Sequence, residues 1–392
     1  MVQRLCPLRV HLRLLTAMDF VLPADLDALA GEAAELAAEW SARTPFPEDS
    51  WIVGHDPALA KELAARGWIG MTWPVEEGGG GRSQLERFVV FEQLIAGGAP
   101  IAAMWFADRQ MGPTLLQFGN EEQRRRWLPG ILAGESMWSI GMSEPDNGSD
   151  VAGLRTRAVR DGEDWIVTGQ KVWTSGAAVA DWIYLIARTD PDAPPHAGLS
   201  ELIVDMHSPG VEVRRIVDMT GNDHFCEVHL NEVRVPGSHL VGELNGSFRQ
   251  LMRQMEHERG GIDRLVSNRL LFEDVRRSGW VDTADPLVRQ ELAALDIGYR
   301  IGRLLVLRET LGQAPKGFSA ATKTFCTEYE QRLAAFCATV AGPYATLLDP
   351  SGDLASRIAR NVCYAPAYTI MGGTTQILRN ILGERLLGLP KG

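Results

Sequence analysis

The hydrophobic periodicity of this chain changes twice, and this change constrains the fold more than any other feature. From about residue 24 to residue 134, apolar residues recur at intervals of three and four, which predicts amphipathic helices. Between residues 137 and 244 the period falls to two, in short segments separated by proline and glycine, which predicts strands. From residue 246 to residue 389 the helical period returns. This order excludes the alternating strand–helix pattern of a dinucleotide-binding sheet.

The sequence therefore predicts an α+β multidomain chain. We expect an N-terminal α-helical domain over residues 19–136, a small β-barrel over 137–245 and a C-terminal α-helical bundle over 246–392. The expected strands are residues 155–160, 165–168, 181–189, 199–206, 211–216 and 226–235. The first two flank Asp161-Gly162, a hairpin signal with a slightly longer loop.

The first 17 residues differ from the rest of the chain in charge. Arg4, Arg9, His11 and Arg13 are not balanced by any acidic residue, and there is no apolar stretch of the kind found in signal peptides. A targeting arm is one interpretation. We prefer a gene start placed too early, with Met18 as the native first residue and residues 1–18 as an extension outside the fold.

Composition excludes several classes of protein. The formal net charge of −11 argues against a nucleic-acid binder, and no apolar run is long enough to predict a membrane-spanning helix. The five cysteines are widely spaced and form no C-x-x-C pair, so we expect reduced thiols in a cytoplasmic protein and no metal site.

Two loops carry residues that suit a bound cofactor. The loop over residues 141–150 contains Ser143 and Ser149 among backbone-permissive glycines, and could direct hydroxyls and N–H groups at an anion or a ring. An ordinary surface turn is the alternative. After a predicted strand, Trp173 could pack against a large flat cofactor that accepts a hydrogen bond from Ser175. An ordinary hairpin with a core tryptophan is the alternative.

Two further features lie in the second helical zone. Glu258 falls within the apolar stripe of a helix predicted over residues 248–266, and burial would raise its pKa toward that of a general base. A structural ion pair is the alternative. Gly372-Gly373-Thr374-Thr375-Gln376 precedes a helix predicted over residues 377–387, whose first N–H groups could bind an anion or a carbonyl oxygen. A helix cap is the alternative.

In combination these motifs resemble those of the acyl-CoA dehydrogenase family. Residues 141–153 are similar to the family's first signature, residues 171–175 to its flavin-contact segment, and residues 373–376 to its C-terminal flavin loop. The resemblance covers residues 19–390 and implies a helical domain, a β-barrel and a four-helix bundle. It implies FAD bound at a subunit interface and α,β-dehydrogenation of an acyl-CoA in the bacterial cytoplasm. It further implies that the β-hydride passes to flavin N5 and that the electrons pass to an electron-transfer flavoprotein.

The resemblance also assigns roles to individual residues. Glu256, Arg259 and Gly372 would contact the substrate, and Ser149 would contact both substrate and flavin. The implied flavin-binding residues are Ile140, Gly141, Met142, Ser143, Ser149, Trp173, Thr174, Ser175, Gly373, Thr374, Thr375 and Gln376.

Two departures from the family pattern bear on mechanism and assembly. Many members carry the catalytic glutamate where this chain has Gly372; a minority carry it on the first helix of the C-terminal domain, at the position of Glu258. We therefore expect Glu258 to be the base. Residues 275–286 lack the Arg-x-x-Phe-Gly motif through which a partner subunit contacts FAD. Bacterial sterol-type members resemble this chain, and some are heterotetramers.

These departures leave the assembly and the exact activity open. The assembly is a homo-oligomer or a heterotetramer with a related chain. A catalytically silent or half-site subunit, and a flavin monooxygenase or oxidase on the same fold, are the alternative functions.

Overall fold

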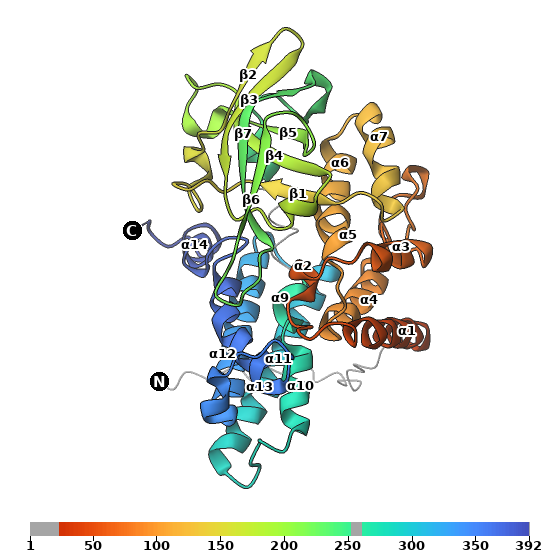
Figure 1. The fold of residues 1–392 in the computed structure, drawn as a ribbon, viewed down its shortest axis with the longest axis vertical. Coiled ribbons are helices and arrows are strands. Elements are labelled where there is room, and N and C mark those ends of the chain that lie inside the picture. Colours follow the sequence, from red (N-terminus) through yellow and green to blue (C-terminus); the bar gives the residue numbers. More distant parts are fainter. Residues whose placement is uncertain (1–22, 252–260, 392) are drawn as a thin grey trace, which may run out of the picture.

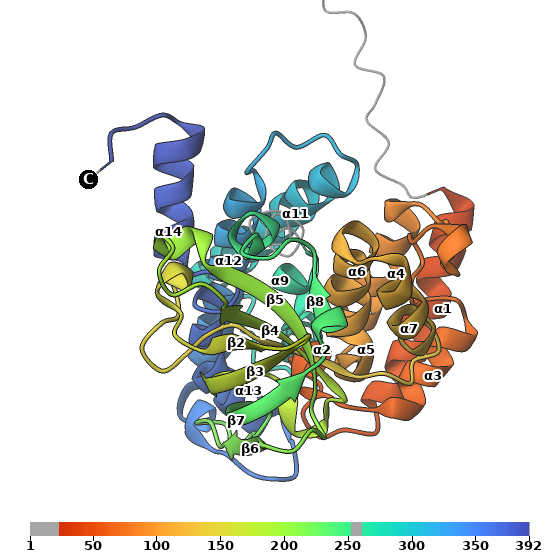
Figure 2. The ribbon, with the colours of Figure 1, turned by 90° about the horizontal axis from the view of Figure 1, so that it is seen from above.

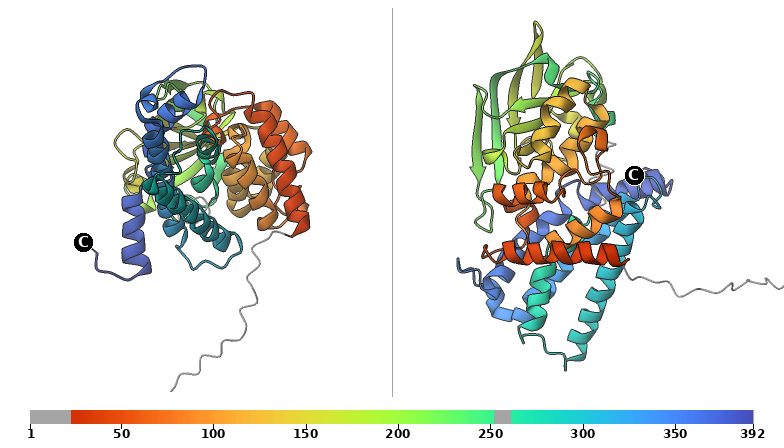
Figure 3. Two further views of the ribbon diagram at one scale, coloured as in Figure 1. Left: turned by 90° about the horizontal axis from the view of Figure 1, so that it is seen from below. Right: turned by 90° about the vertical axis from the view of Figure 1, so that its right-hand side faces the viewer.

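The computed structural model describes residues 23–251 and 261–391, and the fold follows the predicted order of helices, strands and helices. The N-terminal helices lie beside both the sheet and the C-terminal helices (Figures 1 and 3). The extension predicted over residues 1–18 lies outside the described residues, as do Glu256, Glu258 and Arg259. No helix in the described ranges is long and apolar enough to cross a membrane.

The N-terminal region is built from short helices with polar caps. Ser83 and Glu86 form a capping box at one helix, and Asn120 and Gln123 form another, so each satisfies N–H groups that the helix leaves unpaired. The α-helices are α1 (Ala24–Ser41), α2 (Ser50–Val53), α3 (Pro57–Ala65), α4 (Gln84–Ala96), α5 (Ala102–Phe106), α6 (Gly112–Phe118) and α7 (Glu121–Leu132). A π-helical turn, η2 (Ala107–Met111), joins α5 to α6.

The middle region is one strongly curved mixed sheet. Its strands are β1 (Trp138–Gly141), β2 (Arg157–Asp161), β3 (Asp164–Lys171), β4 (Trp182–Arg188), β5 (Leu199–Asp205), β6 (Val211–Ile216), β7 (Phe225–Val235) and β8 (Leu240–Val241). The order is β6-β7-β3-β2-β4-β5-β8, and β1 pairs with β4 in parallel. The curvature encloses a core that strands from both ends of the path share, including Val167, Leu185, Leu202 and Val228.

Three details of the sheet differ from the sequence expectation. The strands β1 and β8 were not predicted, because each is too short to show an alternating pattern. Strand β3 runs on to Lys171, past the predicted end at Thr168. The β2–β3 connection is a tight two-residue turn, with Asp161 paired to Asp164 and Gly162 at φ 63°, and not a longer loop.

The C-terminal region packs helices around α12 (Ser319–Ala341). The others are α9 (Asp263–Val266), α10 (Arg269–Arg277), α11 (Pro286–Thr310), α13 (Leu354–Tyr364) and α14 (Thr375–Asn380), which continues into a π-helical segment, η9 (Ile381–Leu386). The helix predicted over residues 248–266 is not continuous, because Gly261 and Ile262 are non-helical and α9 begins afresh. The C-terminal segment extends away from the body of the molecule (Figure 2).

Buried polar contacts join the three regions. Trp51 of α2 donates its indole N–H to the Ser267 hydroxyl at 2.9 Å, which ties the N-terminal region to the start of the C-terminal region. The Gln123 amide of α7 donates to two carbonyls near β8, at 2.7 Å each. Arg303 of α11 forms a two-pronged ion pair with buried Glu92 of α4 at 2.6 and 2.9 Å. Of the residues that make these contacts, Trp51 also lines the cavity described next.

Candidate functional site

A cavity of about 730 Å³ lies where the three regions meet. It brings together residues predicted from separate motifs and distant parts of the chain. Those that line it are Ile140, Met142, Ser143, Ser149, Trp173, Ser175, Gly372, Gly373 and Thr374. Four other predicted residues are absent from its lining: Gly141 packs against Ile183 and Leu185, Thr174 and Thr375 are buried, and Gln376 is exposed. The predicted residues Glu256, Glu258 and Arg259 are not among those described.

The loop after β1 is shaped by a buried ion pair. Glu144 accepts N–H groups of Arg155 and Thr156 at 2.7 and 2.8 Å, so the loop closes on its own carboxylate. The Lys171 ammonium lies 2.8 Å from Glu144 and also donates to the Met142 carbonyl at 3.0 Å. The result is a fixed loop that presents Ser143 and Ser149 to the cavity.

The ionisation of this pair reflects a balance of burial and attraction. Burial lowers the pKa of Lys171 to about 8, against the stabilising charge of Glu144. Burial alone would raise the pKa of Glu144, but Lys171 and the two N–H bonds outweigh it and lower the value. Each partner therefore depends on the other for its charge.

Trp173 adopts a strained and exposed conformation at the cavity. Its φ of 59° lies in the left-handed region, which costs a non-glycine residue about 1–2 kcal/mol. The turn is held by N–H groups of Thr174 and Gly176, which donate to carbonyls of Cys226 and His224. The indole is 58% exposed and meets Phe225 edge-on, so the alternative of an ordinary core tryptophan is wrong. Such strain is typical of functional positions.

The loop before α14 relies on two glycines. Gly372 and Gly373 have φ of 66° and 91°, values that favour residues without a side chain. The fully buried Lys323 of α12 donates to the Gly373 carbonyl at 2.9 Å and so holds the loop from below. The Thr374 hydroxyl accepts the Ile377 N–H and so caps α14, and Thr374 also lines the cavity. The two alternatives for this segment, a helix cap and a ligand-binding loop, are therefore compatible.

The N-terminal wall of the cavity was missed by the sequence analysis. It consists of Trp51, Ile52, Phe106, Arg109, Gln110 and Met111. Most of these residues belong to or flank η2, where one extra residue per turn breaks the helical period. Arg109 pairs with fully buried Asp263 at 3.1 Å, and Arg264, which also lines the cavity, lies 3.1 Å from the same carboxylate. The only signal in the sequence that could have pointed to this wall is the interruption of the helical hydrophobic period just before Gly112-Pro113.

A buried carboxylate holds the wall between the sheet and the C-terminal region. Glu201 of β5 accepts hydrogen bonds from Tyr184, from Ser247 at 3.1 Å and from Gln250 at 2.6 Å. Ser247 and Gln250 flank Phe248, which lines the cavity beside Tyr184. Glu201 therefore docks the start of the C-terminal region onto the sheet.

The acid–base groups of the lining are unevenly distributed. Among the described residues that line the cavity, Asp150 is the only carboxylate, and it is exposed. Leu251 and Arg264, which stand on either side of residues 252–260 in the sequence, both line the cavity. The arrangement offers an exposed aromatic face, several hydroxyls and a glycine loop, which suit a flat ring system with polar edges.

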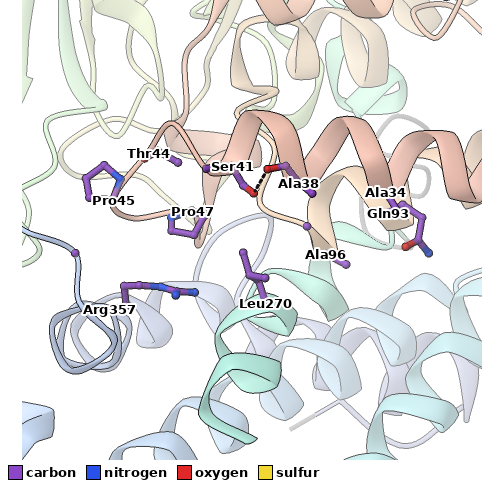
Figure 4. Close-up of a pocket in the computed structure, with 13 residues that line it drawn as sticks. Ala34, Ala38, Ser41, Thr44, Pro45, Pro47, Gln93, Ala96, Leu270 and Arg357 are labelled. Atoms are coloured by element: carbon purple, nitrogen blue, oxygen red, sulfur yellow. Dashed lines mark hydrogen bonds between the residues drawn. The ribbon is translucent and has the colours of Figure 1, made fainter. Parts of the chain in front are cut away.

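A second cavity of about 470 Å³ lies between α1 and the C-terminal helices (Figure 4). Its lining is rich in alanine and proline, with Leu270 and Arg357 on the other side. The Arg357 guanidinium is already paired with Glu48 at 2.5 Å and Asp274 at 2.8 Å. None of the predicted site residues lies here, so the cavity offers no comparable chemistry.

Each of the three regions of the chain matches a known protein domain family, in the same order. The acyl-CoA dehydrogenase N-terminal, middle and C-terminal domain families match residues 27–135, 139–233 and 247–387. Acyl-CoA dehydrogenase IpdE1 of Mycobacterium tuberculosis is 36% identical over 343 residues, covering 85% of this chain and 88% of that protein.

Two solved structures are also similar. The Tcur3481-Tcur3483 steroid ACAD is 32% identical with a TM-score of 0.85, covering 96% of this chain and 100% of that one. The ChsE4-ChsE5 complex of Mycobacterium tuberculosis is 30% identical with a TM-score of 0.83, again covering 96% and 100%.

Proposed function

Because the chain belongs to the acyl-CoA dehydrogenase family, we propose that Glu258 is the base in the family's reaction, the FAD-dependent α,β-dehydrogenation of an acyl-CoA thioester. The observation that carries this proposal is the cavity, which gathers the loop after β1, the Trp173 turn and the glycine loop around one space. The substrate enters that space with its α-carbon near Glu258, since the only carboxylate of the described walls, Asp150, is exposed.

The described residues fit FAD. The exposed indole of Trp173 offers a flat apolar face, and Ile370, 61% exposed, offers further apolar surface that a ring would cover. Ser143, Ser175 and Thr374 bring hydroxyls to the same cavity, as the polar edges of a flavin require. When bound there, FAD supplies the two-electron acceptor for the reaction. Ser149 stands on the same loop, where we assign it to the CoA arm as well.

Position 372 is unsuited to the base. Gly372 has no carboxylate, and its φ of 66° would strain a glutamate placed there. Among the described residues its backbone N–H donates no hydrogen bond, so this N–H can bind the thioester carbonyl and favour loss of the α-proton. Glu258 then takes that proton as the general base.

The experiment replaces the base and a neighbouring carboxylate. We expect Glu258→Gln to abolish turnover while acyl-CoA and FAD binding persist, and Glu256→Gln to retain turnover with an altered KM. Loss of activity in Glu256→Gln with full activity in Glu258→Gln would move the role to Glu256. Full activity in both, within a complex containing a related chain, would make this chain the catalytically silent or half-site subunit.

The electron acceptor and the assembly belong to the same proposal. We assign the electrons to an electron-transfer flavoprotein in the bacterial cytoplasm; rapid reaction of the reduced flavin with oxygen would instead indicate an oxidase or monooxygenase.

Residues 275–286 lack the usual partner-side FAD motif, and similar structures are named as two-chain assemblies. The visible spectrum decides between homomer and heteromer. One FAD per chain expressed alone indicates a homo-oligomer, and a colourless chain that binds FAD only with a related chain indicates a heterotetramer.

A further inference from the structure

We propose that Asp49 is a positioning residue for the reaction, because its carboxylate, bound to the Tyr368 hydroxyl, sets where the Gly372 N–H lies relative to the N-terminal wall of the cavity. The inference rests on the proposed function, in which this N–H binds the thioester carbonyl. It adds a residue that does not itself line the cavity.

Asp49 precedes α2 without performing the capping role that its residue type favours. An aspartate before a helix ordinarily has an extended backbone and accepts an N–H of the first turn. Asp49 instead has φ 61° and ψ 10°, in the left-handed region, and its side chain makes no cap hydrogen bond. The helix is thus left without its cap at a residue with a strained backbone, and such strain is typical of functional positions.

The Asp49 carboxylate binds the C-terminal region instead. Its side chain is buried, and one carboxylate oxygen accepts the Tyr368 hydroxyl at 2.5 Å. Among the described residues the other oxygen has no hydrogen-bond partner, so Tyr368 is the one donor to this carboxylate there. A hydroxyl that donates to an ionised carboxylate makes a stronger hydrogen bond than one that donates to a neutral acceptor. The contact therefore firmly joins two buried residues that are 319 positions apart in the sequence.

Tyr368 belongs to the segment that carries the glycine loop. It lies in the 3-10 helix η8 (Ala365–Thr369), which leads directly into that loop. The buried ammonium of Lys323 holds both ends of this segment, at 3.5 Å from the Tyr368 carbonyl and 2.9 Å from the Gly373 carbonyl. Because the connection is short and held at both ends, a shift of Tyr368 would move Gly372 as well.

The backbone of Asp49 holds another wall of the same cavity. Its carbonyl accepts the N–H groups of Ile52 and Val53 at 2.8 and 2.9 Å and so starts α2. Trp51 and Ile52 of this helix line the cavity. Asp49 thus fixes α2 through its backbone and the glycine loop through its side chain. A donor must lie about 2.7–3.1 Å from the oxygen where charge develops, so the separation of these two walls decides whether the Gly372 N–H reaches the thioester.

The experiment compares FAD-loaded wild type, Asp49→Ala, Asp49→Asn and Glu92→Ala, each with the related chain if FAD binding requires it. Glu92 is the matched control, because it is also a buried carboxylate of the N-terminal region that binds the C-terminal region, through Arg303, but does not line the cavity. One readout is the rate of flavin reduction at saturating octanoyl-CoA. The other is the ratio of Kd values for octanoyl-CoA and S-octyl-CoA, a thioether that lacks the carbonyl oxygen.

We expect Asp49→Ala to slow flavin reduction by about ten- to hundredfold, because a donor displaced by about 1 Å loses much of its effect. The wild type should bind the thioester about three- to tenfold more tightly than the thioether, and Asp49→Ala should lose most of this preference. Asp49→Asn keeps an acceptor for Tyr368 and tolerates the left-handed backbone, so it should stay within about threefold of the wild type. Glu92→Ala should lose stability but keep the rate and the preference.

A wild-type rate with an unchanged thioester preference in Asp49→Ala would overturn the inference, as would an equal loss of rate in Glu92→Ala. Should Asp49→Ala not fold, Tyr368→Phe takes its place with the same expectations, because it removes only the hydroxyl. If neither octanoyl-CoA nor any other acyl-CoA reduces the flavin, the proposed function fails. The binding preference then decides the inference separately, since equal Kd values for octanoyl-CoA and S-octyl-CoA in the wild type would refute it.

Discussion

The Lys171 ammonium lies 2.8 Å from a carboxylate oxygen of Glu144, and the two side chains are 0% and 6% exposed. The pair links the end of β3 to the loop after β1, two segments that both reach the cavity. Its geometry explains why Ser143 and Ser149 sit on a rigid support, since Lys171 also holds the Met142 carbonyl. Desolvated charges of this kind stabilise a structure only when both are present.

Removing the lysine tests this support. We expect Lys171→Met to lower the free energy of unfolding by about 3–5 kcal/mol, because Glu144 would be left buried and unpaired. The FAD content of the purified protein, measured by its visible absorbance, should fall as well. Lys61→Met is the matched control, because Lys61 lies 3.7 Å from Glu135 with both side chains about 60% exposed; it should cost under about 1 kcal/mol. Equal losses in the two variants would contradict the assigned role.

Replacing glycine by alanine should change the free energy of unfolding in opposite directions at two positions. Gly372→Ala forces a side chain into φ 66° and should cost about 1–2 kcal/mol of stability. Gly31 lies within α1, and nothing stands within 4 Å of an added Cβ, so Gly31→Ala should gain about 0.5–1 kcal/mol. Denaturant unfolding measures both. A stabilising Gly372→Ala would show that the loop does not need the left-handed conformation.

Acid should weaken the fold through His224. Burial lowers the pKa of His224 to about 4, and its ring stacks on Phe225 at 3.9 Å between centroids. The folded protein therefore binds this proton less readily than the unfolded chain, whose histidine has a pKa near 6.5. The stability that the neutral ring contributes is present above pH 6.5 and is lost as the pH falls toward 4.

The variant His224→Phe isolates this effect. Between pH 6.5 and 4 we expect the wild type to lose up to about 3 kcal/mol of unfolding free energy relative to the variant. The comparison is made at each pH, because the pKa of Asp49 is raised to about 7 by burial and its titration opposes that of His224. Parallel pH profiles for the two proteins would exclude His224 as the titrating group.

The sequence was informative wherever the signal was local. Five of the predicted strands differ from the structure at one or both ends, but each lies where the alternation placed it, because a strand with one buried face must alternate. Helix α7 lies within the helical zone predicted from residue 24 to residue 134, and its start coincides with a local signal, the capping box of Asn120 and Gln123. The helix predicted over residues 248–266 is interrupted because Gly261 and Ile262 are non-helical, and periodicity does not register such a break.

The residues of the candidate site fall into two groups, those that the sequence alone identified and those that only the tertiary structure identified. Ser143, Trp173 and Gly373 carry chemistry or conformational freedom in their own residue types, so the sequence alone marked them, and together they resembled one family. Gln110, Arg109 and Trp51 looked like ordinary helix residues, and only the packing of the N-terminal helices against the sheet made them a cavity wall. Residue type and local spacing determine which segments form and which loops can hold a cofactor. Which side chains share a cavity depends on contacts between segments distant in sequence, and only the tertiary structure decides those.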